Sequence, residues 1–69
     1  MEPTIEEHAA NGETALQAVN PEYQDELSTA IYDLVADLLH LAHLNDIEPD
    51  YIIHMATMHY DAEINQEII

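Results

Sequence analysis

The chain has 69 residues, with fifteen Asp and Glu, no Lys or Arg, and five His, which gives a formal net charge of −15. Nucleic acids and anionic membranes are bound largely through Lys and Arg. The composition therefore argues against direct binding of nucleic acid and against docking on a membrane, and it favours a basic protein as the partner.

The length predicts one domain of marginal stability, because a domain of this size buries only about 60% of the surface of its unfolded chain. Apolar residues make up 48% of the sequence, more than in disordered acidic tails, so we expect a folded chain. No apolar run reaches the roughly 20 residues of a membrane span, and the acidic start lacks the positive flank of a secretory signal. We expect a cytoplasmic protein.

Residues 1–20 form the least regular segment. Thr4 and Glu7 have the spacing of a capping box, which would begin a short helix. Asn11-Gly12 predicts a turn, and residues 14–19 allow another helical turn. Two interpretations remain open for this N-terminal arm, a short helix or a flexible segment.

A long helix is predicted over residues 21–44. Asn20 can cap it, Pro21 suits the first helical position, and Glu22 favours the positive end of the helix. Its apolar residues recur in steps of three and four, which indicates one broad apolar face. This face comprises Leu27, Ala30, Ile31, Leu34, Val35, Leu38, Leu39, Leu41 and Ala42.

A second helix is predicted over residues 49–65. Asn45-Asp46 supplies the break, and Pro49 followed by Asp50 starts the new helix. Because the connection is short, we expect two antiparallel neighbours, and hence an all-α helical hairpin domain over 21–69. The expected buried side of the second helix is Ile52, Ile53, Met55, Ala56, Tyr60 and Ile64.

A hairpin of this size covers only part of the long helix's apolar face. The rest is expected to pack on the N-terminal arm or on a second copy in a dimeric bundle. Charges that point away from the seam and are screened over about 10 Å leave such a homodimer feasible. The residues expected at this interface are Leu34, Leu38, Leu41 and Ile52.

The carboxylates are the strongest candidates for function. Asp33 and Asp37 lie one helical turn apart, about 5–6 Å, which is comparable to the separation of neighbouring phosphates. Like charges at this spacing cost a helix a few tenths of a kcal/mol, so stability does not explain them. Either they form a generic solubilising face, or they bind a basic partner. The residues expected to bind the partner are Glu22, Glu26, Asp33, Asp37, Asp46, Glu48, Asp50, Asp61 and Glu63.

Four histidines are weak candidates for zinc ligands. His40 and His43 lie three residues apart, and His54 and His59 lie on the second helix. This spacing is not specific, and a histidine near the C-terminus of a helix is explained by the helix dipole. We therefore expect no metal and no other cofactor.

Catalysis has little support in the sequence. There is no Cys and a single Ser, and carboxylate pairs are too abundant to indicate an acid–base site. A metal-dependent enzyme is the remaining alternative, with magnesium held by Glu22, Glu26, Asp33 and Asp37. Because the basic residues expected for phosphate contacts are absent, we expect no enzyme.

In size and charge the chain resembles small acidic proteins of phages and other mobile elements, including anti-restriction and anti-CRISPR DNA mimics. Residues 33–40 and 58–63 are also similar to small helical proteins of such elements. The resemblance implies an inhibitor that occupies the nucleic-acid channel of a basic enzyme in the host cytoplasm. The main alternative is an oligomeric helical scaffold or assembly subunit.

Overall fold

The structure is a computed structural model that describes residues 4–68 and, within them, all side chains except those of Gln24, Glu67 and Ile68. The described residues contain no strand, so the predicted all-α fold is confirmed. No helix in this part of the chain combines the length and the apolar character that crossing a membrane requires. The elements are α1 (Ile5–Val19), the 3-10 turn η1 (Gln24–Glu26), α2 (Leu27–Leu44) and α3 (Pro49–Ile68).

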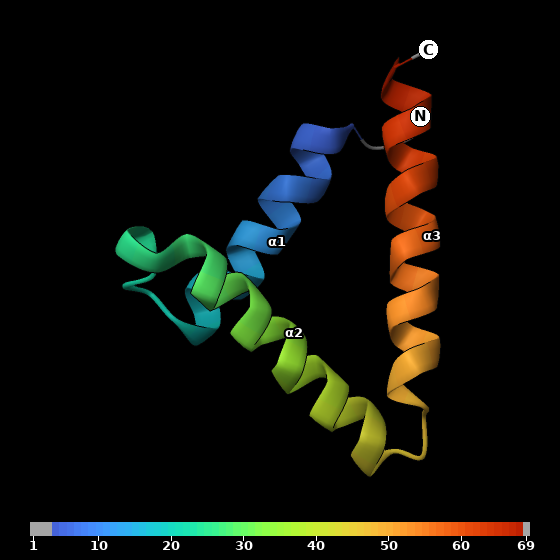
Figure 1. Cartoon of the computed structure of the whole chain (residues 1–69). Coiled ribbons are helices and arrows are strands. Elements are labelled where there is room, and N and C mark those ends of the chain that lie inside the picture. Colours follow the sequence, from blue (N-terminus) through green and yellow to red (C-terminus); the bar gives the residue numbers. More distant parts are fainter. Residues whose placement is uncertain (1–3, 69) are drawn as a thin grey trace.

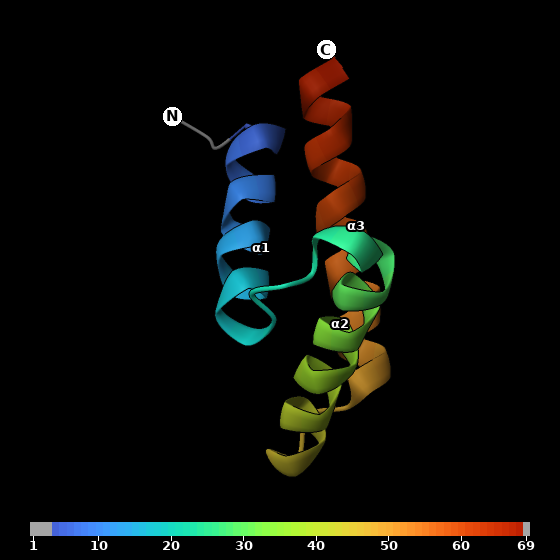
Figure 2. The ribbon, with the colours of Figure 1, turned by 90° about the vertical axis from the view of Figure 1, so that its left-hand side faces the viewer.

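The three helices lie along the sides of a triangle (Figures 1 and 2). Helices α2 and α3 meet at the connection 45–48 and diverge from it, while α1 leads from the far half of α3 back to the start of α2 (Figure 1). The radius of gyration is 13.5 Å, whereas a compact chain of this length has about 11 Å. The arrangement is hairpin-like, but α2 and α3 are splayed instead of packed along their length.

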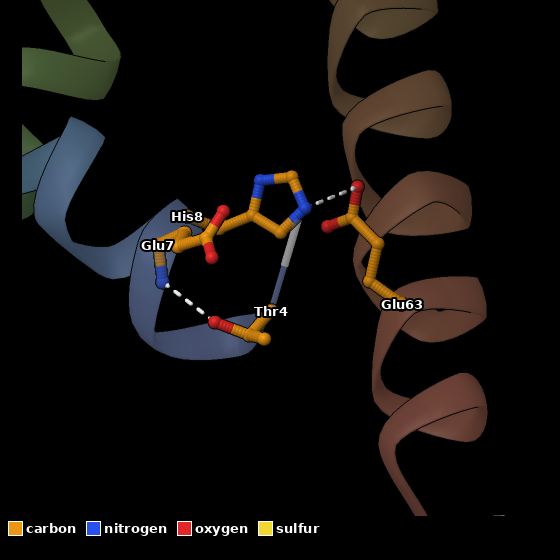
Figure 3. A network of polar contacts seen from close by, with 4 residues as sticks. All are labelled: Thr4, Glu7, His8 and Glu63. Carbon is orange, nitrogen blue, oxygen red and sulfur yellow. Dashed lines mark hydrogen bonds and ion pairs between the residues drawn. The ribbon is translucent and has the colours of Figure 1, made fainter. Parts of the chain in front are cut away.

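The turn predicted at Asn11-Gly12 is wrong, because helix α1 passes through both residues without interruption. Its N-cap is the predicted Thr4, whose Oγ1 accepts a hydrogen bond from the Glu7 N–H at 3.2 Å (Figure 3). A glycine inside a helix costs about 1 kcal/mol relative to alanine. The four alanines of α1 and its packing on α2 and α3 outweigh that cost.

Replacing Gly12 with alanine should raise the free energy of unfolding by about 0.5–1 kcal/mol, because alanine is the better helix former. An added Cβ at Gly12 meets no atom within 4 Å, and the backbone there does not have a positive φ. Urea denaturation followed by circular dichroism measures the change. A loss of stability would instead indicate the turn that the sequence suggested.

The start of α2 also differs from its prediction. Residues 21–22 form a turn, η1 follows, and α2 begins only at Leu27. The reason is Tyr23, which is buried against Leu16 of α1 while its hydroxyl donates to the Glu13 carboxylate at 3.1 Å. Desolvation and then the neighbouring Glu13 raise the pKa of Tyr23, so the phenol stays protonated as the donor. Burying this side chain requires the chain to reverse where the helix was expected to start.

The break at residues 45–46 is confirmed. The Ile47 N–H donates to the Ala42 carbonyl at 2.9 Å, and the Asp46 N–H donates to the His43 carbonyl at 3.2 Å. This is the Schellman arrangement that ends many helices. Asp46 has φ 62, in the left-handed region that glycine usually occupies there. Helix α3 then begins at its predicted proline and extends past the predicted end at residue 65.

The buried core is very small. Among the residues whose side chains are described, only Leu16, Tyr23, Ala30 and Ala42 are buried. The first three form one cluster, against which the half-buried Leu34 packs. This cluster joins α1 to the first half of α2.

Much of the apolar face predicted for α2 is exposed in the single chain, because α1 covers it only in part. The predicted buried side of α3 is likewise only partly covered, since Ile53, Ala56 and Tyr60 are exposed while Ile52, Met55 and Ile64 are half-buried. The cause is the splay, because diverging helices cannot cover each other's inner faces. The exposed members on α2 are Leu27, Ile31, Val35, Leu38 and Leu41.

Candidate protein-binding surface

The carboxylates are displayed to solvent. Every Asp and Glu whose side chain the structure describes is exposed, except Glu63, which is half-buried. The sequence contains no Lys or Arg to neutralise them. Among the side chains that the structure describes there is a single ion pair, between His8 Nε2 and Glu63 Oε2 at 3.5 Å (Figure 3). The surface therefore carries negative charge that the chain itself does not compensate.

The nine predicted partner-binding carboxylates belong to three separate segments of the chain. One group precedes and occupies α2, one surrounds the connection between α2 and α3, and one lies in the second half of α3 (Figure 1). In that order the groups are Glu22, Glu26, Asp33 and Asp37, then Asp46, Glu48 and Asp50, then Asp61 and Glu63.

Asp33 and Asp37 have the most defined surroundings. With Val19 and Asn20 they line a hollow of about 380 Å³ between α2 and the C-terminal end of α1. The C-terminal end of a helix carries a partial negative charge and favours cations. The two carboxylates and the end of α1 therefore add their negative potentials in one concave place. A lysine or arginine side chain of a partner fits that electrostatic environment.

The carboxylate of Asp46 occupies a position where it does not stabilise the fold. Asp46 adopts a left-handed backbone conformation, which Asp tolerates better than most residues but which glycine adopts more readily. It also lies two residues after Leu44, the last residue of α2, where the helix dipole disfavours a negative charge. A glycine would serve the turn better, so folding does not explain the carboxylate.

The four candidate histidines do not form a site in the structure. His40, His43, His54 and His59 are all exposed. His43 lies in the last turn of α2, where the helix dipole favours it. Among the described residues no group of three or more His, Asp and Glu side chains is placed to hold a metal ion.

His8 is a residue that sequence reasoning missed. It packs between α1 and α3 in an apolar hollow with Ile5, Ala9, Tyr60 and Ile64, beside its partner Glu63. The spacing of Ile5, His8 and Ala9 puts the three on one helix face. That spacing was the available signal, and it was hidden by the expected turn that followed it.

A second, apolar surface lies between α1 and α2. We call it the apolar groove; it has a volume of about 450 Å³. Of the predicted interface residues, Leu34 packs within the chain, Leu38 and Leu41 are exposed, and Ile52 is half-buried. The groove is lined by Ala9, Gly12, Glu13, Leu16, Tyr23, Leu27, Ile31, Leu34, Val35 and Leu38.

Comparisons of the chain with protein-family models, with curated proteins and with solved structures found no match. The two surfaces are therefore interpreted from their own geometry and charge.

Proposed function

We propose that this chain is a binding protein whose carboxylates occupy the nucleic-acid channel of a basic enzyme, and that it thereby inhibits a host defence or DNA-processing enzyme. The observation that carries this proposal is the hollow in which Asp33 and Asp37 lie beside the C-terminal end of α1. Three sources of negative potential converge there, and the sequence has no Lys or Arg to offset them.

The dimensions of the molecule support mimicry of nucleic acid. Its longest axis is 37 Å, which is about one turn of B-form DNA. Carboxylates lie on each helix and at the corner between α2 and α3. Basic residues spaced along a DNA-binding channel would therefore meet negative charge over a comparable length.

Inhibition would be competitive. The inhibitor and the nucleic acid would bind the same lysine and arginine side chains of the enzyme, so that binding of one excludes the other. Opposite net charges accelerate association, and salt weakens it. The proposal therefore requires a complex that forms at low salt and dissociates as salt rises.

An oligomeric scaffold or assembly subunit is the second candidate, favoured by the exposed apolar face of α2. Assembly through apolar surface resists salt, because the hydrophobic effect does not depend on the attraction of opposite charges. The response of the complex to salt therefore separates the two functions.

The double substitution Asp33→Asn and Asp37→Asn should weaken binding to the basic partner by about tenfold, which corresponds to about 1.4 kcal/mol. The partner would first be captured on the immobilised wild-type chain at low salt and eluted by sodium chloride. Its affinity for each variant, and the displacement of labelled duplex DNA from it, would then be measured by fluorescence anisotropy.

The matched control is Glu6→Gln with Glu7→Gln, which removes the same number of charges at the opposite end of α1. We expect this control to change affinity much less, provided that its melting temperature remains close to that of the wild type. Equal losses in both variants would show that the hollow has no special role. Failure of duplex DNA to compete would refute mimicry.

A further inference from the structure

Four apolar residues of α2 form an exposed stripe that the chain itself leaves uncovered. We define the α2 stripe as Leu27, Ile31, Val35 and Leu38, which are 50%, 49%, 45% and 51% exposed. Their spacing of four, four and three residues places them on one side of the helix. The stripe forms the α2 wall of the apolar groove.

The exposed area of the chain shows how much surface is left to bury. The chain exposes 5854 Å², whereas a compact monomer of 7.8 kDa exposes about 4,400 Å². The surplus of roughly 1,400 Å² exceeds the roughly 800 Å² that each partner contributes to a standard protein interface. A stable dimer therefore needs less area than this fold leaves uncovered.

The charges around the groove restrict its occupant. Asp33 and Asp37 line a second hollow, which shares Leu16 and Leu34 with the groove, and neither carboxylate lines the groove itself. Among the described residues that line the groove, only Glu13 carries a carboxylate, and it accepts a hydrogen bond from the Tyr23 hydroxyl. The groove thus lacks the carboxylate density that would attract a basic segment, and it suits an uncharged apolar helix face. The α2 stripe of another molecule is such a face.

We propose that a second copy of this chain packs its α2 stripe into the apolar groove of the first, forming a two-fold symmetric homodimer. A two-fold contact uses the same patch on both molecules, so one uncharged stripe can serve both sides. The proposal is independent of the function proposed above, because it uses none of the partner-binding carboxylates.

Salt distinguishes this homodimer from a complex with a basic protein. Two chains with a formal charge of −15 repel each other, and salt screens that repulsion. The dimer should therefore become tighter as sodium chloride rises, whereas a complex with a basic partner should become weaker.

The test is the mass in solution, measured by light scattering and sedimentation from low micromolar to near millimolar concentration. We expect the wild type to reach twice 7.8 kDa, and to do so at lower concentration when salt is added. The double substitution Ile31→Ser and Leu38→Ser should weaken self-association by about tenfold or more. The control Tyr32→Ser should not, because Tyr32 is exposed on α2 but lies outside the stripe.

A wild type that stays monomeric at every protein and salt concentration would overturn the proposal. The groove would then be a binding site for a different protein. A dimer that survives the double substitution, or that Tyr32→Ser disrupts equally, would also overturn it, because another face would then form the contact. Circular dichroism establishes that the variants remain helical.

Cross-linking gives a second measurement that does not depend on removing apolar side chains. The chain has no cysteine, so a single introduced cysteine can form a disulfide only with another molecule. Ile31→Cys and Val35→Cys occupy the middle of the stripe, near the expected two-fold axis. At least one of them should give an oxidised dimer, and Tyr32→Cys should not. Failure of both stripe cysteines to cross-link would overturn the proposal.

Discussion

Leu16→Ala is expected to lower the free energy of unfolding by about 3 kcal/mol, because truncating a buried leucine removes apolar contacts and leaves a cavity. Leu16 is 4% exposed and forms a cluster with Tyr23 and Ala30. Since this cluster joins α1 to α2, its loss should affect the whole fold. Urea denaturation followed by circular dichroism measures the effect.

Val19→Ala is the matched control for that substitution. Val19 lies on the same helix, three residues further along, and is 58% exposed. Its truncation should change the free energy of unfolding by no more than about 0.5 kcal/mol. If both variants lost stability equally, the cluster around Leu16 would not be the main core of the chain.

Added salt is expected to raise the melting temperature by about 10 °C or more between 0.01 M and 1 M sodium chloride. Two carboxylates about 20 Å apart repel by about 0.2 kcal/mol in water without salt. Fifteen acidic residues without a single Lys or Arg make many such pairs. Folding brings the charges closer together, so screening should favour the folded state by a few kcal/mol.

Potassium chloride should have the same effect as sodium chloride, because screening does not depend on which monovalent cation is present. Dimer formation would add a dependence on protein concentration. Thermal unfolding should therefore be measured at several protein concentrations, and the salt effect compared among them. A melting temperature that does not change with salt concentration would contradict the interpretation that the surface charge is uncompensated.

The helix boundaries that depend on local chemistry could be predicted from the sequence. Thr4 caps α1, Asn45-Asp46 ends α2, and Pro49 begins α3, because capping and proline effects act within one turn. The boundaries that failed depend on tertiary contacts. Tyr23 is buried against α1, and because of that contact α2 begins at Leu27 instead of residue 21.

The candidate surfaces also combine features that local chemistry determines with features that depend on tertiary contacts. That the carboxylates would be exposed followed directly from their charge. The placement of Asp33 and Asp37 beside the end of α1 could not be predicted, because it depends on how α1 packs on α2. An apolar pattern also shows that a helix face will be buried, but not whether its own chain or another molecule covers it. The sequence therefore left two covers open for the rest of the α2 face, the N-terminal arm or a second copy.

The triangular arrangement gives α1 the role of a brace. One end is held to α2 through Leu16, and the other reaches α3 through His8 and Glu63. Its fifteen residues span about 22 Å at 1.5 Å per residue, and this length sets how far α2 and α3 stand apart. Lengthening α1 by one turn would widen that gap by about 5 Å while keeping the same side chains inward. Under the proposed function, the width of the basic channel that this molecule would fit depends on the length of α1, a helix that carries none of the nine candidate partner-binding carboxylates.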